Sequence, residues 1–427
     1  MTYSQYLKQK DSGTAWLQAI PSHWRVKRLK FSADLINNKV SVEDSDLPYL
    51  GLEHIESWTG RKLDGEITAS EGTASKFASE DVLFGKLRPY LAKVHLANQD
   101  GLISSEALVI RCKSEAHPDF LKYYILSRDF INIADSSTYG SKMPRASWDF
   151  IGNLPVLLPA LDEQQAITRF LDYKTAQIDA LIAKKQSLLT KLAEKRTALI
   201  SHAVTKGLDP SAPMQDSGVE WLGDIPKHWK VLSLRYACDF LNRRRIPLSS
   251  EERGSMSDRV YPYYGASGII DYVEEFIFDE KTILIAEDGA NLLSRSTPLA
   301  FIADGKYWVN NHAHILNPIK GPFEFWANLL CIIRYEPWIT GSAQPKLSKE
   351  NLGGIKLPLP PREEQEAIVK YFVDHTNQID PMIKKVIEAM ERLREYRAAL
   401  ITNAVTGKID VRNFNMQRSA NMETVNV

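Results

Sequence analysis

The sequence predicts an α+β protein made of two similar halves, each with a globular domain followed by one long helix. Two phrases recur in the same order. The segment 12–24 returns at 217–229, and the segment 162–205 returns at 363–406, at offsets of 205 and 201 residues. The stretches between these phrases are much less alike. A repeated frame with differing middles is typical of a protein that presents two different surfaces with one geometry.

The repeat divides the chain into five parts. They are a first globular domain at 1–153, a first helical segment at 154–207, a linker with a second globular domain at 208–353, a second helical segment at 354–410, and a C-terminal tail at 411–427. The globular parts carry short β-rich runs that Gly, Asn, Asp and Ser interrupt. These runs predict short strands, and helices are expected near 118–128 and 322–335, so each globular part is an α/β domain.

Each helical segment has the signals of one long helix. A proline precedes it, acidic residues occupy its first turn, and a glycine follows its end. Apolar residues then recur with a seven-residue step, which Lys185 interrupts in the first helix. The predicted seam consists of Ile167, Leu171, Ile178, Leu181, Leu188, Leu192 and Leu199 in the first helix, and of Ile368, Phe372, Ile379, Met382, Val386, Leu393 and Leu400 in the second.

The length of these helices predicts that they pair with each other. At about 1.5 Å per residue, a helix of about 40 residues is roughly 60 Å long. An apolar seam of that length needs a partner, and the other copy is the obvious one. The alternative is a single amphipathic helix that lies on its own domain.

Composition limits the class of protein. The chain has 427 residues, of which 44% are apolar, and its 53 basic and 53 acidic residues cancel to a net charge of zero. Bulk positive charge therefore does not hold nucleic acid on this chain, although charge can still be segregated locally. No apolar run reaches the roughly 18–20 residues of a membrane span. The three cysteines are far apart and form no C-x-x-C pair, so we expect no disulfides. Because no signal peptide is visible either, we expect a cytoplasmic protein without a membrane partner.

Motifs of catalysis are absent from the sequence. It has no Asn/Asp-Pro-Pro-aromatic tetrapeptide of an adenine methyltransferase and no G-x-x-x-x-G-K-[ST] phosphate loop. No cluster of carboxylates with a nearby lysine indicates a nuclease, and His312 and His314 lack a third metal ligand at an evident spacing. We therefore expect no catalytic residue, no metal site and no cofactor on this chain.

A second repeated phrase lies at the end of each globular domain, at 140–147 and at 341–348. In each copy, small residues allow close approach of a backbone, and a cation stands five residues after the glycine. Such a loop could hold a phosphate or reach a base edge, and a structural turn is the alternative. The candidate DNA contacts in these phrases are Ser141, Lys142, Arg145, Ser342, Gln344 and Lys346.

The remaining candidates for DNA contact mix cations and aromatic residues with turn residues. They are Lys86, Arg88 and Tyr90 after a predicted strand, Arg243 and Arg244 in a basic run, Tyr264 in an aromatic turn, and Arg295. An ordinary solvated surface is the alternative for these residues. The His-Trp pairs at 23–24 and 228–229 recur in the frame, where the two halves agree, so we interpret them as core scaffold.

These markers together make the chain resemble the specificity subunits of type I restriction–modification systems. The resemblance rests on the W-L-x-x-I-P-x-H-W opening, on the Leu-Pro and Glu-Gln that begin each long helix, and on the half-by-half repeat. It covers nearly the whole chain. It implies two target-recognition domains that alternate with two conserved helical regions, which pair as an antiparallel coiled coil. Such pairing relates the domains by a pseudo-two-fold axis, and each domain reads one half of a split double-stranded DNA site.

The resemblance also implies partners and cofactors. Two methyltransferase subunits bind the helical regions and methylate adenine, and restriction subunits complete the complex. S-adenosylmethionine, ATP and magnesium then serve the partner subunits, and this chain is not an enzyme. Two alternatives stay open: a recognition subunit of a modification-only methyltransferase assembly, and a coiled-coil adaptor that binds protein rather than DNA.

Overall fold

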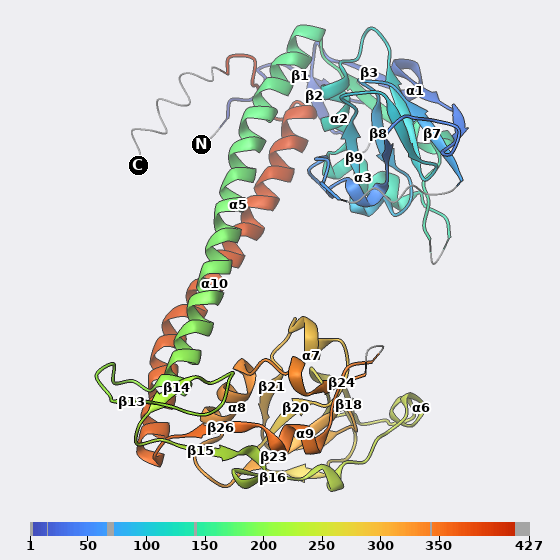
Figure 1. Ribbon diagram of the computed structural model, residues 1–427. Coiled ribbons are helices and arrows are strands. Elements are labelled where there is room, and N and C mark those ends of the chain that lie inside the picture. The colour runs from blue at the N-terminus through green and yellow to red at the C-terminus, as the bar shows by residue number, and fades with distance from the viewer. Residues whose placement is uncertain (1–2, 15, 66–71, 141–142, 342–343, 415–427) are drawn as a thin grey trace. The chain divides into compact units, whose positions relative to one another are not determined.

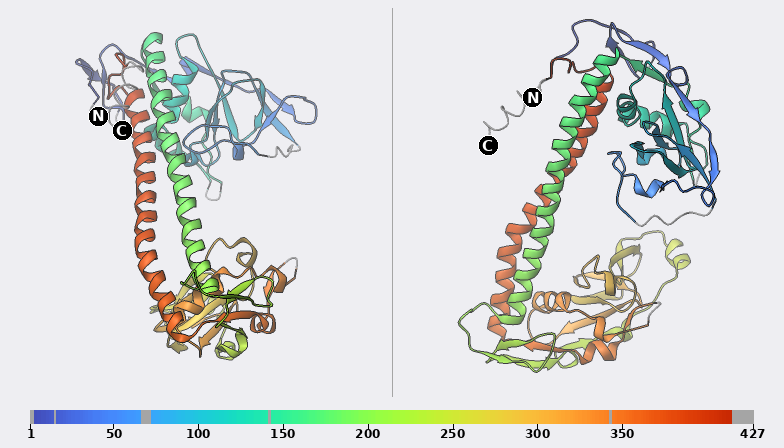
Figure 2. Two further views of the ribbon diagram at one scale, coloured as in Figure 1. Left: turned by 60° about the vertical axis from the view of Figure 1, so that its left-hand side comes forward. Right: turned by 45° about the horizontal axis from the view of Figure 1, so that its top comes forward.

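The computed structural model describes residues 3–14, 16–65, 72–140, 143–341 and 344–414. The chain divides into two compact units, each with one globular domain and a part of both long helices (Figures 1 and 2). The first unit is made of Met1–Gln186 and Ile387–Val427, and the second of Ser187–Val386. Both ends of the sequence therefore belong to one unit, while the middle of the chain forms the other.

Two four-stranded sheets form the centre of the first domain. The antiparallel sheet β4-β11-β8-β9 contains β4 (Ala33–Ile36), β11 (Ala107–Cys112), β8 (Val82–Gly85) and β9 (Val94–Leu96). The sheet β5-β7-β10-β6 contains β5 (Lys39–Ser41), β7 (Thr73–Phe77), β10 (Gly101–Ser104) and β6 (Tyr49–Leu50), and β10 pairs with β6 in parallel. Helix α2 (Pro118–Ile125) packs on the first sheet and α3 (Arg128–Ser136) follows it, around buried Phe84, Phe120 and Phe130.

The second domain repeats the first of these sheets and rearranges the other. The antiparallel sheet β16-β23-β20-β21 contains β16 (Cys238–Phe240), β23 (Ala313–Pro318), β20 (Thr282–Ala286) and β21 (Ala300–Ala303). The sheet β18-β17-β22-β19 contains β18 (Gly268–Val273), β17 (Tyr261–Gly265), β22 (Lys306–Val309) and β19 (Phe278–Asp279). Helix α8 (Phe323–Ile332) packs on β21, at the place where the sequence predicts a helix.

Short elements connect these sheets to the rest of each unit. Strand β3 (Arg25–Arg28) pairs with β12 (Pro155–Leu158), β15 (Lys230–Ser233) with β26 (Lys356–Leu359), β1 (Gln9–Asp11) with β2 (Ala19–Pro21), and β13 (Met214–Asp216) with β14 (Asp224–Pro226). The others are α1 (Leu29–Ser32), α4 (Trp148–Ile151), α6 (Ser250–Gly254), α7 (Asn291–Ser294), α9 (Lys349–Gly354), β24 (Ile339–Thr340), β25 (Lys346–Leu347), and 3-10 turns at 52–54, 89–91, 234–236, 242–244 and 336–338. Strands β3 and β15, near the start of each domain, therefore pair with β12 and β26, the strands that directly precede the long helices.

Helices α5 (Leu161–Lys206) and α10 (Arg362–Val405) confirm the two long helices that the sequence predicts. They have 46 and 44 residues and lie side by side as an antiparallel pair (Figures 1 and 2). In the first unit, Arg397 of α10 donates to Asp179 of α5 at 2.9 Å. In the second unit, Arg196 of α5 donates to Asp380 of α10 at 3.1 Å. Each unit therefore has its own ion pair between the two helices.

Most of the predicted seam residues are covered. Ile167, Leu171, Ile178, Leu192, Ile368, Phe372, Ile379 and Leu400 are buried, and Leu199, Val386 and Leu393 are half-buried. Leu181, Leu188 and Met382 are 47%, 41% and 49% exposed. The prediction that these three residues lie in the apolar seam is therefore wrong. A pair of helices covers only a narrow stripe of each, and a straight helix of 3.6 residues per turn drifts away from a strict seven-residue repeat.

The described residues contain no helix whose length and apolar character would let it cross a bilayer. Nor do these residues bring together three or more His, Cys, Asp or Glu side chains that could hold a metal ion. The three cysteines are free thiols, and burial raises the pKa of Cys112 and Cys238 to about 12. Both thiols are therefore uncharged at neutral pH.

Candidate nucleic-acid interface

The first copy of the loop phrase runs beside the segment that leaves β8. The Arg88 N–H donates to the carbonyl of Pro144 at 2.8 Å, and the Ala146 N–H donates to the carbonyl of Lys86 at 3.0 Å. Arg145 lies between these two bonds. The cation of the phrase is thereby fixed at the end of a central strand.

The second copy makes the corresponding bonds beside β20. The Gly289 N–H donates to the carbonyl of Pro345 at 3.1 Å, and the Leu347 N–H donates to the carbonyl of Glu287 at 2.7 Å. Lys346 lies between them. The two domains therefore hold the cation of each phrase at equivalent places on equivalent strands.

A third position completes each arrangement. The Lys86 N–H donates to the carbonyl of Glu106 at 2.9 Å, and the Glu287 N–H donates to the carbonyl of His312 at 2.9 Å. We call Lys86, Glu106 and Arg145 the first strand-end cluster, and Glu287, His312 and Lys346 the second strand-end cluster. The backbone bonds are the same in the two clusters, and the side chain differs at every position.

The glycine and the last serine of each phrase have structural roles. Gly140 and Gly341 have φ values of 94° and 83°, a region that side chains disfavour. Ser147 and Ser348 cap α4 and α9 by accepting backbone N–H bonds. The structural-turn alternative therefore holds for these four residues. Of the other candidates in the phrases, Ser141, Lys142 and Ser342 lie outside the described residues, and Gln344 is exposed.

A bidentate ion pair dominates the first strand-end cluster. Arg145 donates from Nε to one carboxylate oxygen of Glu106 at 2.8 Å and from Nη2 to the other at 3.1 Å. These bonds and the charges of Arg145 and Lys86 hold the pKa of the Glu106 carboxyl below its usual range, against a weaker effect of burial. Both side chains are about one-third exposed, at 34% and 28%, so the pair is ordered and still reaches solvent.

Arg88 and Tyr90 lie next to this cluster. Arg88 is exposed, and its φ of 52° is in the left-handed region, which is costly for a residue with a side chain. The second domain has Gly289 at the corresponding place, with a φ of 101°. Tyr90 is exposed in the 3-10 turn that follows. The two domains therefore differ at this position, where Arg88 carries a cation and Gly289 has no side chain.

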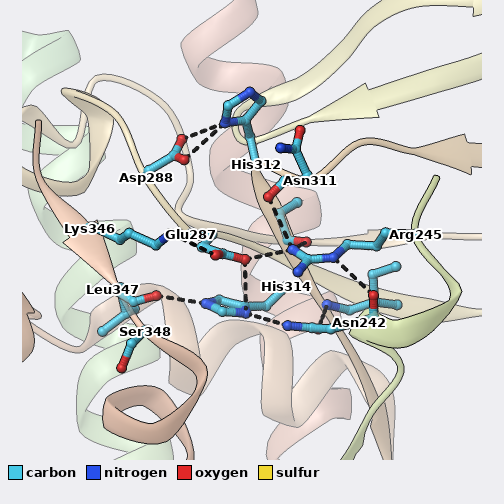
Figure 3. A network of polar contacts seen from close by, with 12 residues as sticks. Asn242, Arg245, Glu287, Asp288, Asn311, His312, His314, Lys346, Leu347 and Ser348 are labelled. Atoms are coloured by element: carbon cyan, nitrogen blue, oxygen red, sulfur yellow. Dashed lines mark hydrogen bonds and ion pairs between the residues drawn. The ribbon is translucent and has the colours of Figure 1, made fainter. Parts of the chain in front are cut away.

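Glu287 lies at the centre of the second strand-end cluster (Figure 3). Its carboxylate accepts a hydrogen bond from Arg245 Nη1 at 2.5 Å and lies 3.4 Å from the Lys346 ammonium group. Burial acts to raise the pKa of Glu287, but the Arg245 hydrogen bond and the charges of Arg245 and Lys346 outweigh it, and the pKa is lowered. The carboxylate is thus ionised and engaged with internal cations.

His314 lies next to Glu287 and is buried as a neutral ring. Its Nε2 donates to the carbonyl of Leu347 at 2.7 Å, and Asn242 Nδ2 donates to its Nδ1 at 2.8 Å. Burial lowers the pKa of His314. Because Nδ1 accepts a hydrogen bond and carries no proton, its approach to Glu287 at 3.5 Å is not an ion pair.

His312 and Lys346 form the exposed part of the second cluster. His312 Nδ1 lies 2.9 Å from both carboxylate oxygens of Asp288, and the imidazole of His312 is half-exposed (Figure 3). A hollow of about 430 Å³ adjoins the cluster, and Arg243 and Lys346 are among the residues that line it. Arg243, a predicted contact, is exposed there.

Arg244 and Tyr264 are engaged within the second domain. Arg244 Nη1 donates to Glu280 at 2.6 Å, and its guanidinium lies over the Phe278 ring. Tyr264 packs against Tyr307, with ring centroids 5.6 Å apart. The structure does not place Arg244 and Tyr264 in the second strand-end cluster.

Arg295 has a structural role at the end of α8. Its guanidinium donates to the backbone carbonyls of Cys331 and Ile333. The last carbonyls of a helix lack intrahelical partners, and a cation there complements the helix dipole. The geometry does not support the assignment of Arg295 as a DNA contact.

Sequence reasoning missed Glu106 of the first strand-end cluster, and Arg245 and Asp288, which contact residues of the second. Arg245 belongs to the basic run at 243–245, which is the signal that could have found it. Glu106 has no such signal, because its partner Arg145 is 39 residues away. Asp288 follows Glu287, a pair without any recognisable metal or catalytic motif.

The repeated His-Trp pairs anchor each domain to the start of its long helix. Trp24 Nε1 donates to Glu163 of α5 at 3.2 Å, and Trp229 Nε1 donates to Glu364 of α10 at 2.7 Å. Both tryptophans are buried, which confirms the scaffold interpretation for them. The histidine before each tryptophan bonds the same carboxylate and is partly exposed.

Comparison with known proteins places both halves of the chain in one family. The family model described as "Type I restriction modification DNA specificity domain" matches residues 22–191 and 226–391. Each match covers one globular domain and part of the helix that follows it. The family match therefore follows the internal repeat.

Individual relatives match either the whole chain or a part of it. The type I restriction enzyme MjaVIII specificity subunit of Methanocaldococcus jannaschii is 22% identical over 96% of this chain and 99% of its own length. The EcoDI specificity subunit of Escherichia coli is 27% identical over 44% of this chain and 43% of its own length. The putative specificity subunit S.HindORF215P of Haemophilus influenzae is 38% identical over 33% and 35% of the two lengths. The chain thus spans less than half of the last two relatives.

One solved structure shares the fold over nearly the whole chain. A chain in the structure that describes complex assembly and conformational transition of the type I R-M system aligns with a TM-score of 0.69 and 19% identity. The alignment covers 90% of this chain and 98% of that one. The likeness is one of fold.

Proposed function

This chain belongs to the family of the type I restriction modification DNA specificity domain, and we propose that it is the DNA sequence-recognition subunit of a type I restriction–modification complex. In this role, each globular domain reads one half of a split, asymmetric double-stranded site. The chain itself recognises DNA and catalyses nothing. It acts in the cytoplasm, together with its partner subunits.

The two strand-end clusters carry this proposal. They share their backbone hydrogen bonds, yet one presents Lys86, Glu106 and Arg145 while the other presents Glu287, His312 and Lys346. A protein that reads two unlike half-sites needs a common orientation toward the DNA backbone and different contacts to the bases. A coiled-coil adaptor for proteins would not explain why cations recur at the equivalent strand ends.

The proposal includes the catalytic partners. Two methyltransferase subunits bind the helical regions and use S-adenosylmethionine to methylate adenine, and restriction subunits supply cleavage that depends on ATP and magnesium. The net charge of zero on this chain supports this division, because the assembly then has to draw many of its phosphate contacts from other subunits. No cofactor is assigned to this chain.

Methylation mapping tests the proposal. The chain is purified alone and with a co-expressed methyltransferase subunit, each is incubated with DNA and S-adenosylmethionine, and methylated adenines are located by sequencing. We expect no methyl transfer by the chain alone and methylation of one split site by the assembly. Methylation by the isolated chain, or the same methylated site in an assembly that lacks this chain, would contradict the proposal. Co-purification of a restriction subunit separates a restriction complex from a modification-only assembly.

A further inference from the structure

The pair between Glu106 and Arg145 leaves one edge of a guanidinium group open. A guanidinium carries five N–H donors in one plane. The Nε donor and one Nη2 donor point to Glu106, and Nη1 has no partner among the residues that the structure describes. The remaining Nη1 and Nη2 donors therefore form a second fork on the edge that Glu106 leaves open. Such a fork matches the O6 and N7 acceptors that guanine presents in the major groove.

The surrounding contacts give this fork a fixed direction. The Arg145 N–H donates to the carbonyl of Tyr139 at 3.1 Å, and the Tyr139 N–H donates back at 3.3 Å. The backbone and the guanidinium of Arg145 are thus both held before any DNA arrives. A side chain that is ordered in the free protein loses less conformational entropy on binding.

The ion pair between Arg111 and Asp81 in the same domain has the same geometry but lies away from Lys86 and Arg88. Arg111 donates from Nε and Nη2 to the two oxygens of Asp81, both at 2.7 Å, and Asp81 is buried. Arg111 is five residues along β11 from Glu106, about 17 Å away at the usual rise of a strand. Lys86 and Arg88 follow β8 at the Glu106 end. Two cations that could meet DNA phosphates therefore lie at the end of the sheet where Arg145 lies.

The second domain differs at the place of Arg145. Lys346 offers a compact ammonium group, which cannot form a planar fork. Glu287 replaces the neighbouring Lys86, and His312 replaces the carboxylate that orients Arg145. The same backbone frame thus presents a planar fork in one domain and a point charge in the other.

We propose that Arg145, oriented by Glu106, reads the guanine of one G·C base pair in the half-site of the first domain, whereas Lys346 contacts the other half-site with a single ammonium group. This inference rests on the proposed function and adds the base that the first domain recognises. Glu106 acts as a positioning residue that directs the open edge of Arg145 toward the DNA.

Methylation mapping of variants, with the methyltransferase subunit present, tests the inference. Arg145→Lys keeps the charge and removes the fork, so the preference for G·C at one position of one half-site should fall about 5- to 150-fold, the factor that corresponds to 1–3 kcal/mol. All other positions should stay unchanged. Glu106→Gln should relax the same position to a smaller extent. Arg111→Lys, the matched control, should change no position.

The outcome at other positions decides between roles for Arg145. A uniform loss of affinity at every position is the signature of a phosphate contact and would overturn the inference. Relaxation at an A·T pair, or an unchanged site in Arg145→Lys, would overturn it as well. Thermal unfolding midpoints are compared for every variant, and if Arg145→Lys does not fold, Glu106→Gln decides by the same criteria.

A variant of the second domain separates this inference from the proposed function. Lys346→Ala should alter only the half-site that Arg145→Lys leaves intact. A parent assembly that methylates a split site, with Arg145→Lys equal to the parent, overturns the inference alone. A parent assembly that methylates no specific sequence overturns both.

Discussion

A single carboxylate holds the start of each long helix, and its burial differs between the units. Glu163 accepts hydrogen bonds from the Tyr6 hydroxyl at 2.8 Å, from Trp24 Nε1 at 3.2 Å and from His23 Nε2 at 2.8 Å. Glu163 is 6% exposed, whereas Glu364, which bonds its own tryptophan and histidine, is 40% exposed. The equivalent carboxylate is therefore shielded from solvent in the first unit and accessible to solvent in the second.

This difference predicts unequal costs of removing the two carboxylates. Glu163→Ala should lower the free energy of unfolding by about 3 kcal/mol, because a buried hydroxyl and a buried indole N–H lose their acceptor. Glu364→Ala should cost only about 1 kcal/mol, because water can replace the carboxylate there. Urea unfolding at neutral pH, followed by tryptophan fluorescence, measures both values. Equal costs would show that burial does not set the strength of this contact.

Glu287 predicts a pH dependence in the acid range. Its pKa is lowered from 4.5 in the folded state, so the carboxylate stabilises the fold above that pH, and the contribution is lost as pH falls through the folded pKa. Glu287→Gln should therefore show a smaller loss of stability than the parent when pH is lowered from about 5 to 3. Glu275→Gln, which makes the same substitution at an exposed glutamate, is the control variant. An unchanged slope in Glu287→Gln, measured by urea unfolding at each pH, would refute the prediction.

At the scale of elements, the end of α8 is held by a cation from another part of the second domain. Arg295 follows α7 with a φ of 51° and donates to the carbonyls of Cys331 and Ile333. The helix supplies acceptors that its own backbone leaves unpaired. A residue that the sequence offers as a DNA contact thus serves the packing of a helix.

Removal of this cap should weaken the domain without changing recognition. Arg295→Ala should cost about 1–2 kcal/mol, because charge-assisted bonds at a helix end are lost. The neighbouring Arg334 is exposed and serves as the control, with an effect within about 0.5 kcal/mol for Arg334→Ala. Thermal unfolding gives the stabilities, and methylation mapping with the methyltransferase subunit gives the half-sites. An altered half-site in Arg295→Ala with unchanged stability would restore its role in DNA contact.

At the scale of the whole molecule, the balance of 53 basic and 53 acidic residues limits how strongly the chain alone can hold DNA. Affinity for DNA falls with salt in proportion to the number of phosphates that cations neutralise. The exposed cations in or next to the two strand-end clusters include Arg88, Arg243 and Lys346. Such a small set can neutralise only a few phosphates.

We therefore expect the salt dependence of DNA binding to steepen on assembly. For the chain alone, the slope of log affinity against log salt should be shallow, with a magnitude of at most about 4. This slope corresponds to about four neutralised phosphates. With the methyltransferase subunit, the slope should become clearly more negative. Fluorescence anisotropy across a salt titration measures both. Equal slopes would mean that this chain supplies the phosphate contacts by itself.

Local patterns were sufficient to predict the long helices. Helix α5 spans 161–206 and α10 spans 362–405, close to the predicted 162–205 and 363–406, because helix periodicity and end signals act over a few residues. The strands appeared in the sequence only as short runs. Their common order in the two domains could not be read from it, since strand pairing joins distant segments.

The sequence by itself determined the repeated frame, the two long helices and the absence of catalytic motifs, because each of these is recognised from the order of residues within continuous segments. Only the tertiary structure decided which cations face solvent. Arg88 and Arg295 look alike in the sequence, yet one is exposed and the other binds helix carbonyls. Arg145 acquired its orientation from Glu106, 39 residues away. Ion pairing and burial are set within a few ångströms in space, and chain distance does not predict them.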